Sequence, residues 1–184
     1  MNAPLSERAR RQHEVVAALA AELPRHALLW QPEDTVPYEC DGLTAYRERP
    51  LVVALPESAA QVAAVLRACH TLGVPVVARG AGTGLSGGAM PNAMGVTLGL
   101  AKFNRILKLD PYSRTAVVQC GVRNLAISEA AAPHGLYYAP DPSSQIACTI
   151  GGNVAENSGG VHCLKYGLTL HNVLKVKGFT VEGE

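Results

Sequence analysis

Glycine is concentrated in two stretches of this chain, and both have the composition of ligand-binding loops. Seven of the 18 glycines lie in residues 80–99, and five lie in residues 151–167. Because glycine has no side chain, it adopts positive φ readily and lets the backbone approach a bound molecule closely. Two such clusters are more than turns alone require, which indicates that both surround a ligand.

The first stretch directly follows an expected strand and resembles an anion-binding loop in composition. It comprises Arg79, Gly80, Ala81, Gly82, Thr83, Gly84, Leu85, Ser86, Gly87 and Gly88. Backbone N–H groups of such a loop can converge on a phosphate without a helix. Thr83 and Ser86 would add hydroxyl donors, and Arg79 would add a positive charge. A loop with a purely structural role is the alternative.

Two other phosphate-binding motifs do not fit this stretch. The span 82–87 matches the spacing G-x-G-x-x-G, but a dinucleotide site requires a helix to begin at the third glycine. Pro91 and Gly95 follow instead, and a strand is expected from Val96, which leaves no room for such a helix. The P-loop is excluded because no Lys-Ser or Lys-Thr pair follows the glycines.

The second cluster combines glycine with small amide and hydroxyl side chains. Its candidate binding residues are Pro140, Asp141, Pro142, Ser143, Thr149, Gly151, Gly152, Asn153, Glu156, Asn157, Gly159 and Gly160. Such groups suit the polar edge of a flat heterocycle, whose ring nitrogens and carbonyls they can meet with hydrogen bonds. The pattern alone predicts only a long polar loop, and such loops within compact domains are usually functional or disordered.

Regular elements are expected on both sides of the first loop. Residues 51–55 form a short apolar strand, and a helix follows in which Ser58 and Gln61 match a capping box. This helix ends at Gly73, and the β-branched residues 74–78 form the next strand. A strand, a helix and a strand in this order predict a parallel pair with a right-handed crossover.

Further elements follow downstream. A strand is expected at 96–100, and strands at 106–109 and 115–119 flank a turn signal and predict a hairpin. Asn124 is expected to cap a helix that runs to Ala132. Residues 173–181 have the composition of one or two further strands.

Composition indicates an ordinary globular domain. The net charge is +1, 48% of residues are hydrophobic and 17% are charged, and no basic stripe indicates nucleic-acid binding. No apolar run approaches about 18 residues, so no membrane-spanning helix is predicted. Arg8 and Arg11 could suggest a targeting peptide, but no apolar core follows them. We expect instead an amphipathic helix that ends near Pro24 and has a solvated basic face.

The five cysteines predict neither a metal site nor disulfides. No C-x-x-C pair occurs, so a cysteine-rich zinc site is not expected. The odd number of cysteines and the absence of a signal peptide favour reduced thiols in the cytoplasm. His162 and Cys163 are adjacent, but their side chains would diverge in an extended segment, so they are not expected to act together.

Together these stretches resemble the FAD-binding domain of the vanillyl-alcohol-oxidase-type flavoproteins. Within these flavoproteins, the chain most resembles the group that contains the FAD subunit of glycolate oxidase, D-lactate dehydrogenase and D-2-hydroxyglutarate dehydrogenase. It rests on residues 37–42, 50–56, 75–88, 133–144 and 149–160.

The resemblance implies an α+β fold, with α/β-like character, in which two subdomains hold an extended FAD. Residues 1–30 would form a helical segment, 31–112 the first subdomain and 113–184 the beginning of the second. The second subdomain is expected to be incomplete, and the substrate domain of the family to be absent.

The resemblance also assigns roles to both loops. Residues 79–88 would surround the pyrophosphate, while 140–143 and 149–160 would line the rest of the flavin nucleotide. Some members of the superfamily attach FAD through a histidine at the place where Thr83 stands here. Non-covalent FAD is therefore expected.

The implied chemistry is oxidation of a small 2-hydroxy acid, such as glycolate or D-lactate, to the 2-oxo acid. Hydride would pass to flavin N5. The catalytic residues are expected in the absent domain, so this chain would carry none of them and the isolated chain is expected to be inactive. Iron–sulfur and second flavin subunits are implied partners, at the inner membrane or in the cytoplasm. The alternatives are a non-catalytic assembly fragment and a flavoprotein of the same fold with another substrate.

Overall fold

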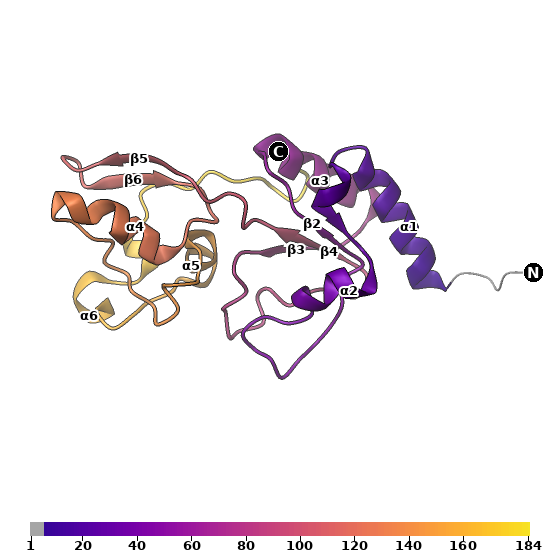
Figure 1. Cartoon of the computed structure of the whole chain (residues 1–184), viewed down its shortest axis with the longest axis horizontal. Helices are drawn as coiled ribbons and strands as arrows, with labels where there is room; N and C mark the ends of the chain where they lie inside the picture. The colour runs from indigo at the N-terminus through magenta and orange to yellow at the C-terminus, as the bar shows by residue number, and fades with distance from the viewer. Residues whose placement is uncertain (1–5) are drawn as a thin grey trace, which may run out of the picture. The chain divides into compact units, whose positions relative to one another are not determined.

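The computed structural model describes residues 6–184 and divides them into two compact units (Figure 1). The first unit contains the chain up to Arg79, together with Leu85–Gly99 and Gly178–Glu184. The second unit contains Gly80–Gly84 and Leu100–Lys177. The subdomain boundary expected between 112 and 113 falls in the turn of a hairpin whose two strands both belong to the second unit.

A four-stranded sheet forms the centre of the first unit. Its strands are β1 (Leu28–Leu29), β2 (Val52–Ala54), β3 (Val76–Arg79) and β4 (Val96–Gly99), in the order β1-β2-β4-β3. β4 pairs in parallel with β2 and with β3, and β1 adds an antiparallel edge. β2 and β3 were expected to be neighbours, but β4, buried at all four positions, lies between them. The N–H of Val96 donates a hydrogen bond to the carbonyl of Pro75 at 2.8 Å, which extends the pairing of β3 with β4.

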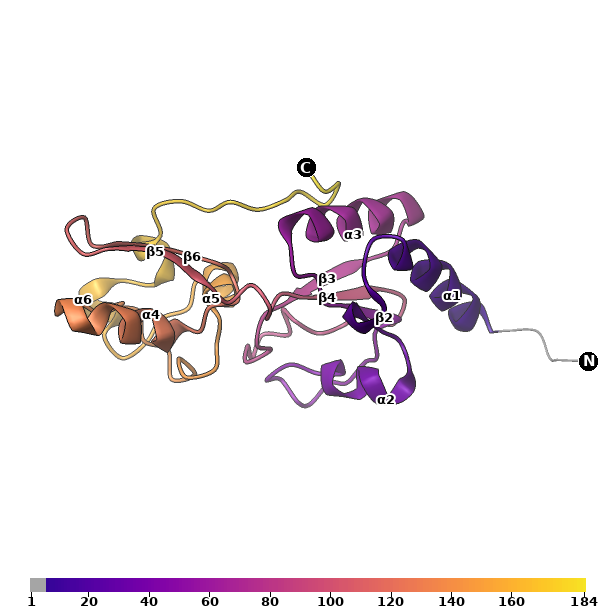
Figure 2. The ribbon, with the colours of Figure 1, turned by 45° about the horizontal axis from the view of Figure 1, so that its top comes forward.

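Helices lie on both sides of this sheet. Figure 2 shows α3 (Ala59–Leu72) on one side and α2 (Pro32–Thr35) on the other, with α1 (Glu7–Ala20) beside α3. Val15 and Leu19 of α1 are fully buried, which confirms the amphipathic first helix.

The basic face expected to be solvated on α1 is partly engaged. The Arg8 guanidinium donates to the carbonyls of Ala93 and Pro50, and the Arg11 guanidinium donates to the carbonyl of Leu72. Arginine carries five donors in a planar group, so it can hold several loop carbonyls at once. These contacts hold α1 to the chain before β2, to the connection between β3 and β4, and to the end of α3.

The expected capping box of α3 is half formed. The Ser58 hydroxyl accepts a hydrogen bond from the Gln61 N–H at 3.3 Å, as predicted. The Gln61 side chain accepts from the N–H of Glu57 at 2.8 Å and not from that of Ser58, so the return contact is displaced by one residue. Gly73 ends the helix in the left-handed conformation.

The second unit is built around a hairpin and three α-helices. The elements are β5 (Ile106–Asp110), β6 (Thr115–Val118), α4 (Asn124–Ala131), α5 (Ile150–Glu156) and α6 (Cys163–Tyr166). The antiparallel hairpin confirms the prediction, and Figures 1 and 2 show α4 and α5 on one side of it. Val122, Ile127 and Ile150 form the core of the unit, with Ile106 and Val118 of the hairpin packed against it.

Short 3-10 helices complete the described chain. They are η1 (Arg25–Ala27), η2 (Val36–Tyr38), η3 (Ala132–His134) and η4 (Thr169–Asn172). η3 continues α4 and ends at Gly135, which agrees with the expected end of that helix near Ala132.

Three expectations for the second half of the chain were wrong. The polar stretch after Thr149 is the helix α5 and not a continuous loop, because its backbone packs against Cys120 and Asn157 ends it at φ +50°. Cys163 begins the short helix α6, so its neighbourhood is not extended. Residues 173–181 form no strand, because within residues 6–184 no strand pairs with them.

We predict that Ser58→Ala lowers the free energy of unfolding by about 1 kcal/mol, because the N–H of Gln61 loses its acceptor. Ser58→Asp keeps an acceptor oxygen at this position and is the matched control. Chemical denaturation of both variants measures the difference. Equal losses in the two variants would contradict a capping role for Ser58.

Candidate functional site

The first part of the glycine-rich loop packs directly on Thr149. A methyl group on Gly80 would overlap the Thr149 hydroxyl, so only glycine permits this approach. Thr149 is 6% exposed, and its Oγ1 is buried without a hydrogen-bond partner among the described residues. A buried hydroxyl without a partner costs free energy, which indicates that this place suits a polar ligand.

A pocket of about 420 Å³ lies beside this contact, within the second unit. Its lining residues are Ala81, Ala101, Asn104, Ile106, Gly121, Val122, Arg123, Ala126, Ala147 and Thr149. Two of these, Ala81 and Thr149, were predicted site residues, and they come from the two separate clusters. Gly121 was missed, although it lies only three residues after the end of β6 (Val118) and a glycine there is a signal of close backbone approach.

The remaining part of the loop belongs to the first unit. The carboxylate of Asp41, 4% exposed, accepts from the N–H of Leu43 at 2.9 Å and from that of Ala89 at 3.4 Å. Arg79 donates to the carbonyl of Cys40 at 2.8 Å and lies 5.7 Å above the ring of Tyr38. The end of β3 and the end of the loop are therefore held to residues 38–43. Arg79 was predicted to face a phosphate, but its Nη1 donates to the carbonyls of Cys40 and, at 3.5 Å, of Ala89.

Asn124 has a different role from the one predicted. It is the first residue of α4, not the cap, and its side chain is fully buried. Its Nδ2 donates to the carbonyl of Pro140 at 3.0 Å, and its Oδ1 accepts from Nδ2 of Asn153 at 2.8 Å. Asn153 is 2% exposed, so part of its amide serves this internal network. The two halves of the second cluster are thus joined through one buried side chain.

The outer residues of the second cluster are also connected. Both carboxylate oxygens of Asp141 contact His162, and a methyl group on Gly160 would overlap the carbonyl of Asp141. Asn157 accepts from the N–H of Leu170 at 2.9 Å.

The predicted residues therefore form two groups. In the second unit the structure brings together Gly80, Gly84, Thr149 and Glu156, and a methyl group on Gly84 would come within 3.8 Å of the Glu156 carboxylate. Residues 79 and 85–88 lie in the first unit. Gly82 has φ +70° and Gly87 has φ +76°, values that disfavour any side chain.

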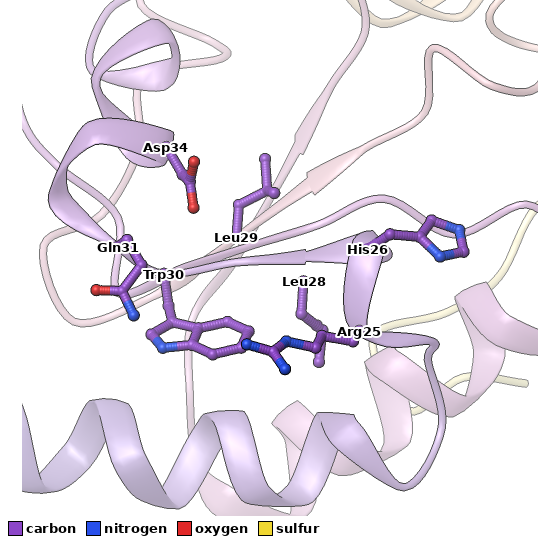
Figure 3. A pocket seen from close by; sticks show the side chains of 7 residues that line it. All are labelled: Arg25, His26, Leu28, Leu29, Trp30, Gln31 and Asp34. Atoms are coloured by element: carbon purple, nitrogen blue, oxygen red, sulfur yellow. The ribbon is translucent and has the colours of Figure 1, made fainter.

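A second pocket, of about 470 Å³, lies in the first unit and contains none of the predicted residues. Figure 3 shows its lining, in which the side chain of Arg25 extends toward the ring of Trp30 below β1. It offers no glycine-rich backbone and one carboxylate, Asp34, so its chemistry does not match the predicted site.

The titratable residues give no sign of metal or thiol chemistry. Within residues 6–184, no group of three or more His, Cys, Asp or Glu side chains could hold a metal ion. All five cysteines lie in this range and are free thiols. Burial raises the pKa of the Cys69 thiol to about 11, which keeps it protonated and unreactive at neutral pH.

No helix within residues 6–184 has the length and apolar character needed to cross a membrane.

Comparison with known proteins decides the family. Residues 50–184 match the model of the family described as FAD binding domain. The chain belongs to this family. Its fold is the FAD-binding fold of the vanillyl-alcohol-oxidase type, a mixed arrangement of helices and sheet.

Relatives in sequence are oxidoreductases. The chain is 64% identical to glycolate oxidase subunit GlcD of Escherichia coli (strain K12) over 170 aligned residues. The alignment covers 92% of the chain and 34% of the relative. It is 40% identical to the same subunit of Bacillus subtilis (strain 168), over 80% of the chain and 31% of the relative. D-lactate dehydrogenase of Archaeoglobus fulgidus is 36% identical, over 88% of the chain and 37% of the relative. The chain spans about a third of the length of these relatives.

Solved structures share the fold at low sequence identity. A variant of Phl p 4, a glucose dehydrogenase, aligns with a TM-score of 0.81 at 18% identity, over 93% of this chain and 37% of that one. Alkyldihydroxyacetonephosphate synthase aligns with a TM-score of 0.75 at 22% identity, over 91% of this chain and 35% of that one.

The residues present fit FAD. Close backbone approach at Gly80, the buried hydroxyl of Thr149 and the adjacent pocket supply N–H groups, a hydroxyl and space for a phosphate-linked nucleotide.

We predict that Gly80→Ala lowers the melting temperature, because the added methyl group displaces Thr149 at a cost of about 1–3 kcal/mol. Gly84→Ala is the matched control, since the nearest atom to its methyl group is 3.8 Å away. Thermal unfolding followed by circular dichroism checks both variants. Equal melting temperatures for wild type and Gly80→Ala would contradict the packing of the loop on Thr149.

Proposed function

We propose that this chain binds FAD non-covalently through both glycine-rich clusters, as the FAD-binding part of an oxidoreductase that acts on a small 2-hydroxy acid. The observation that carries the proposal is the contact of Gly80 with the buried, unpaired hydroxyl of Thr149, which joins the two predicted clusters within one unit. The 64% identity to the glycolate oxidase subunit and the 36% identity to D-lactate dehydrogenase support the substrate class.

In this proposal, backbone N–H groups of residues 80–84 bind the pyrophosphate, together with Thr149. Residues 140–143 and 151–160 line the rest of the flavin nucleotide, and the Asn124–Asn153 network fixes both segments. Preformed donors bind a ligand more tightly than mobile ones, because less conformational entropy is lost on binding. Thr83 provides no histidine for a covalent link to the flavin.

The bound FAD supplies the hydride acceptor for oxidation of the α-carbon to the 2-oxo acid. The residues of this chain bind and orient the cofactor, and none of them is assigned as the base that takes the hydroxyl proton. We propose that the base lies in a separate substrate domain, and that iron–sulfur and second flavin subunits are partners. Two relatives are named as subunits of glycolate oxidase, which supports assembly with other subunits but does not identify them.

FAD titration of the purified chain, followed by flavin fluorescence, tests the binding site. Gly82→Val forces a β-branched side chain onto φ +70°, and Gly152→Val adds bulk beside Thr149, so both are expected to weaken FAD binding at least about tenfold. Gly178→Val is the control, because no atom lies within 4 Å of an added Cβ there. A folded wild-type chain without saturable binding, or variants that bind as wild type does, would contradict the proposed site.

Anaerobic reduction of the flavin tests the substrate class in the whole protein that carries this chain. Addition of glycolate or D-lactate is expected to bleach the visible flavin absorbance, whereas glucose is the control because a fold relative oxidises it. Reduction by glucose alone would overturn the 2-hydroxy-acid assignment while leaving the FAD site intact.

A further inference from the structure

Both carboxylate oxygens of Asp141 contact the same residue, His162. Its Oδ2 lies 2.6 Å from Nδ1 of His162, and its Oδ1 accepts from the backbone N–H of His162 at 3.2 Å. Because a carboxylate only accepts hydrogen bonds, Nδ1 must carry the proton. This hydrogen bond is the main reason why the pKa of Asp141 lies below its ordinary value of 3.8. We call the Asp141–His162 pair the clasp.

The turn at Gly160 packs directly against Asp141 and so places His162 beside the carboxylate. A methyl group on Gly160 would overlap both the backbone carbonyl and the carboxylate of Asp141, so the turn before α6 lies directly against that residue. The carbonyl of Gly160 accepts from the N–H of Cys163 at 3.1 Å, which starts the helix that carries Tyr166.

A second contact joins the same two segments. Tyr137 meets the ring of Tyr166 edge-to-face, with centroids 6.1 Å apart, and the ring of His162 lies 6.5 Å from Tyr166. Aromatic pairs in this geometry are favourable beyond the area that they bury. On its inner side, the segment is held by the bond from Asn124 to the carbonyl of Pro140. Residues 137–141 are thus fixed from both sides.

We propose that Asp141 and His162 are positioning residues for FAD, which hold the 140–143 segment against the 158–162 turn. Asp141 was expected to contact the cofactor, but both of its oxygens are directed to His162. In this assignment the clasp acts through the backbone that surrounds FAD and not through direct contact with it. The inference rests on the proposed function, in which residues 140–143 and 151–160 line the cofactor.

The test compares FAD dissociation constants of the wild-type chain, Asp141→Ala, His162→Ala and the double variant. Each single variant is expected to raise the Kd about fivefold, in keeping with a partly exposed pair of polar side chains. The double variant is expected to raise it no further, because either change already opens the clasp. Thermal unfolding of each variant shows that it is folded under the conditions of the titration.

Two variants separate the clasp from a general loss of stability. His162→Asn keeps an N–H donor near the position of Nδ1 and is expected to restore the Kd to within about twofold of wild type. His134→Ala is the matched control, since His134 is an exposed histidine of the same unit, in η3.

A measurement without FAD checks the geometry itself. Nitrogen-15 spectra of the His162 imidazole are expected to show a protonated Nδ1, with a signal that shifts in Asp141→Ala. A wild-type chain that binds FAD, together with an unchanged Kd in His162→Ala, would overturn the clasp and leave the proposed function in place. Additive losses in the double variant would also overturn it. A folded wild-type chain that fails to bind FAD would overturn both proposals.

Discussion

The side chain of Asn124 is fully buried and joins the start of α4, the carbonyl of Pro140 and the amide of Asn153 in α5. Segments rich in glycine and proline have little apolar surface to bury, so hydrogen bonds must fix their path. A buried network of this kind stabilises the fold only when each of its members is satisfied, since an unpaired buried group costs about 1–3 kcal/mol. The two segments proposed to line FAD therefore share one buried support.

Local signals in the sequence predicted much of the fold. The apolar run before Pro56, the cap at Ser58 and the turn between β5 and β6 each rest on neighbours within a few residues, and the structure contains all three. The paired glycine-rich stretches also predicted the family, which the match to residues 50–184 confirms. The strand, the cap and the turn could be predicted because short-range geometry determines them, whereas the family was predicted from a resemblance.

Features that depend on contacts between residues far apart in the sequence could not be predicted from it. Nothing near β2 or β3 shows that β4 separates them, because strand order follows from how the whole sheet packs. The helix α5 contains Gly151 and Gly152, whose low helix propensity favours a loop, and tertiary packing against Cys120 outweighs that preference. Asn124 has the sequence position of a cap, and only the folded chain shows that its amide faces inward. The placement of individual site residues around FAD likewise remains a prediction.

The segment 174–177 alternates aliphatic and lysine side chains, and Leu174 and Val176 are 86% and 66% exposed. An unpaired extended segment of this kind is a template for association between copies of a chain. Lys175 and Lys177 oppose such association through repulsion between like charges, and salt weakens that repulsion because the Debye length falls to about 3 Å at 1 M. The purified chain is therefore expected to self-associate more as ionic strength rises, so dilute buffer is the favourable condition for handling it.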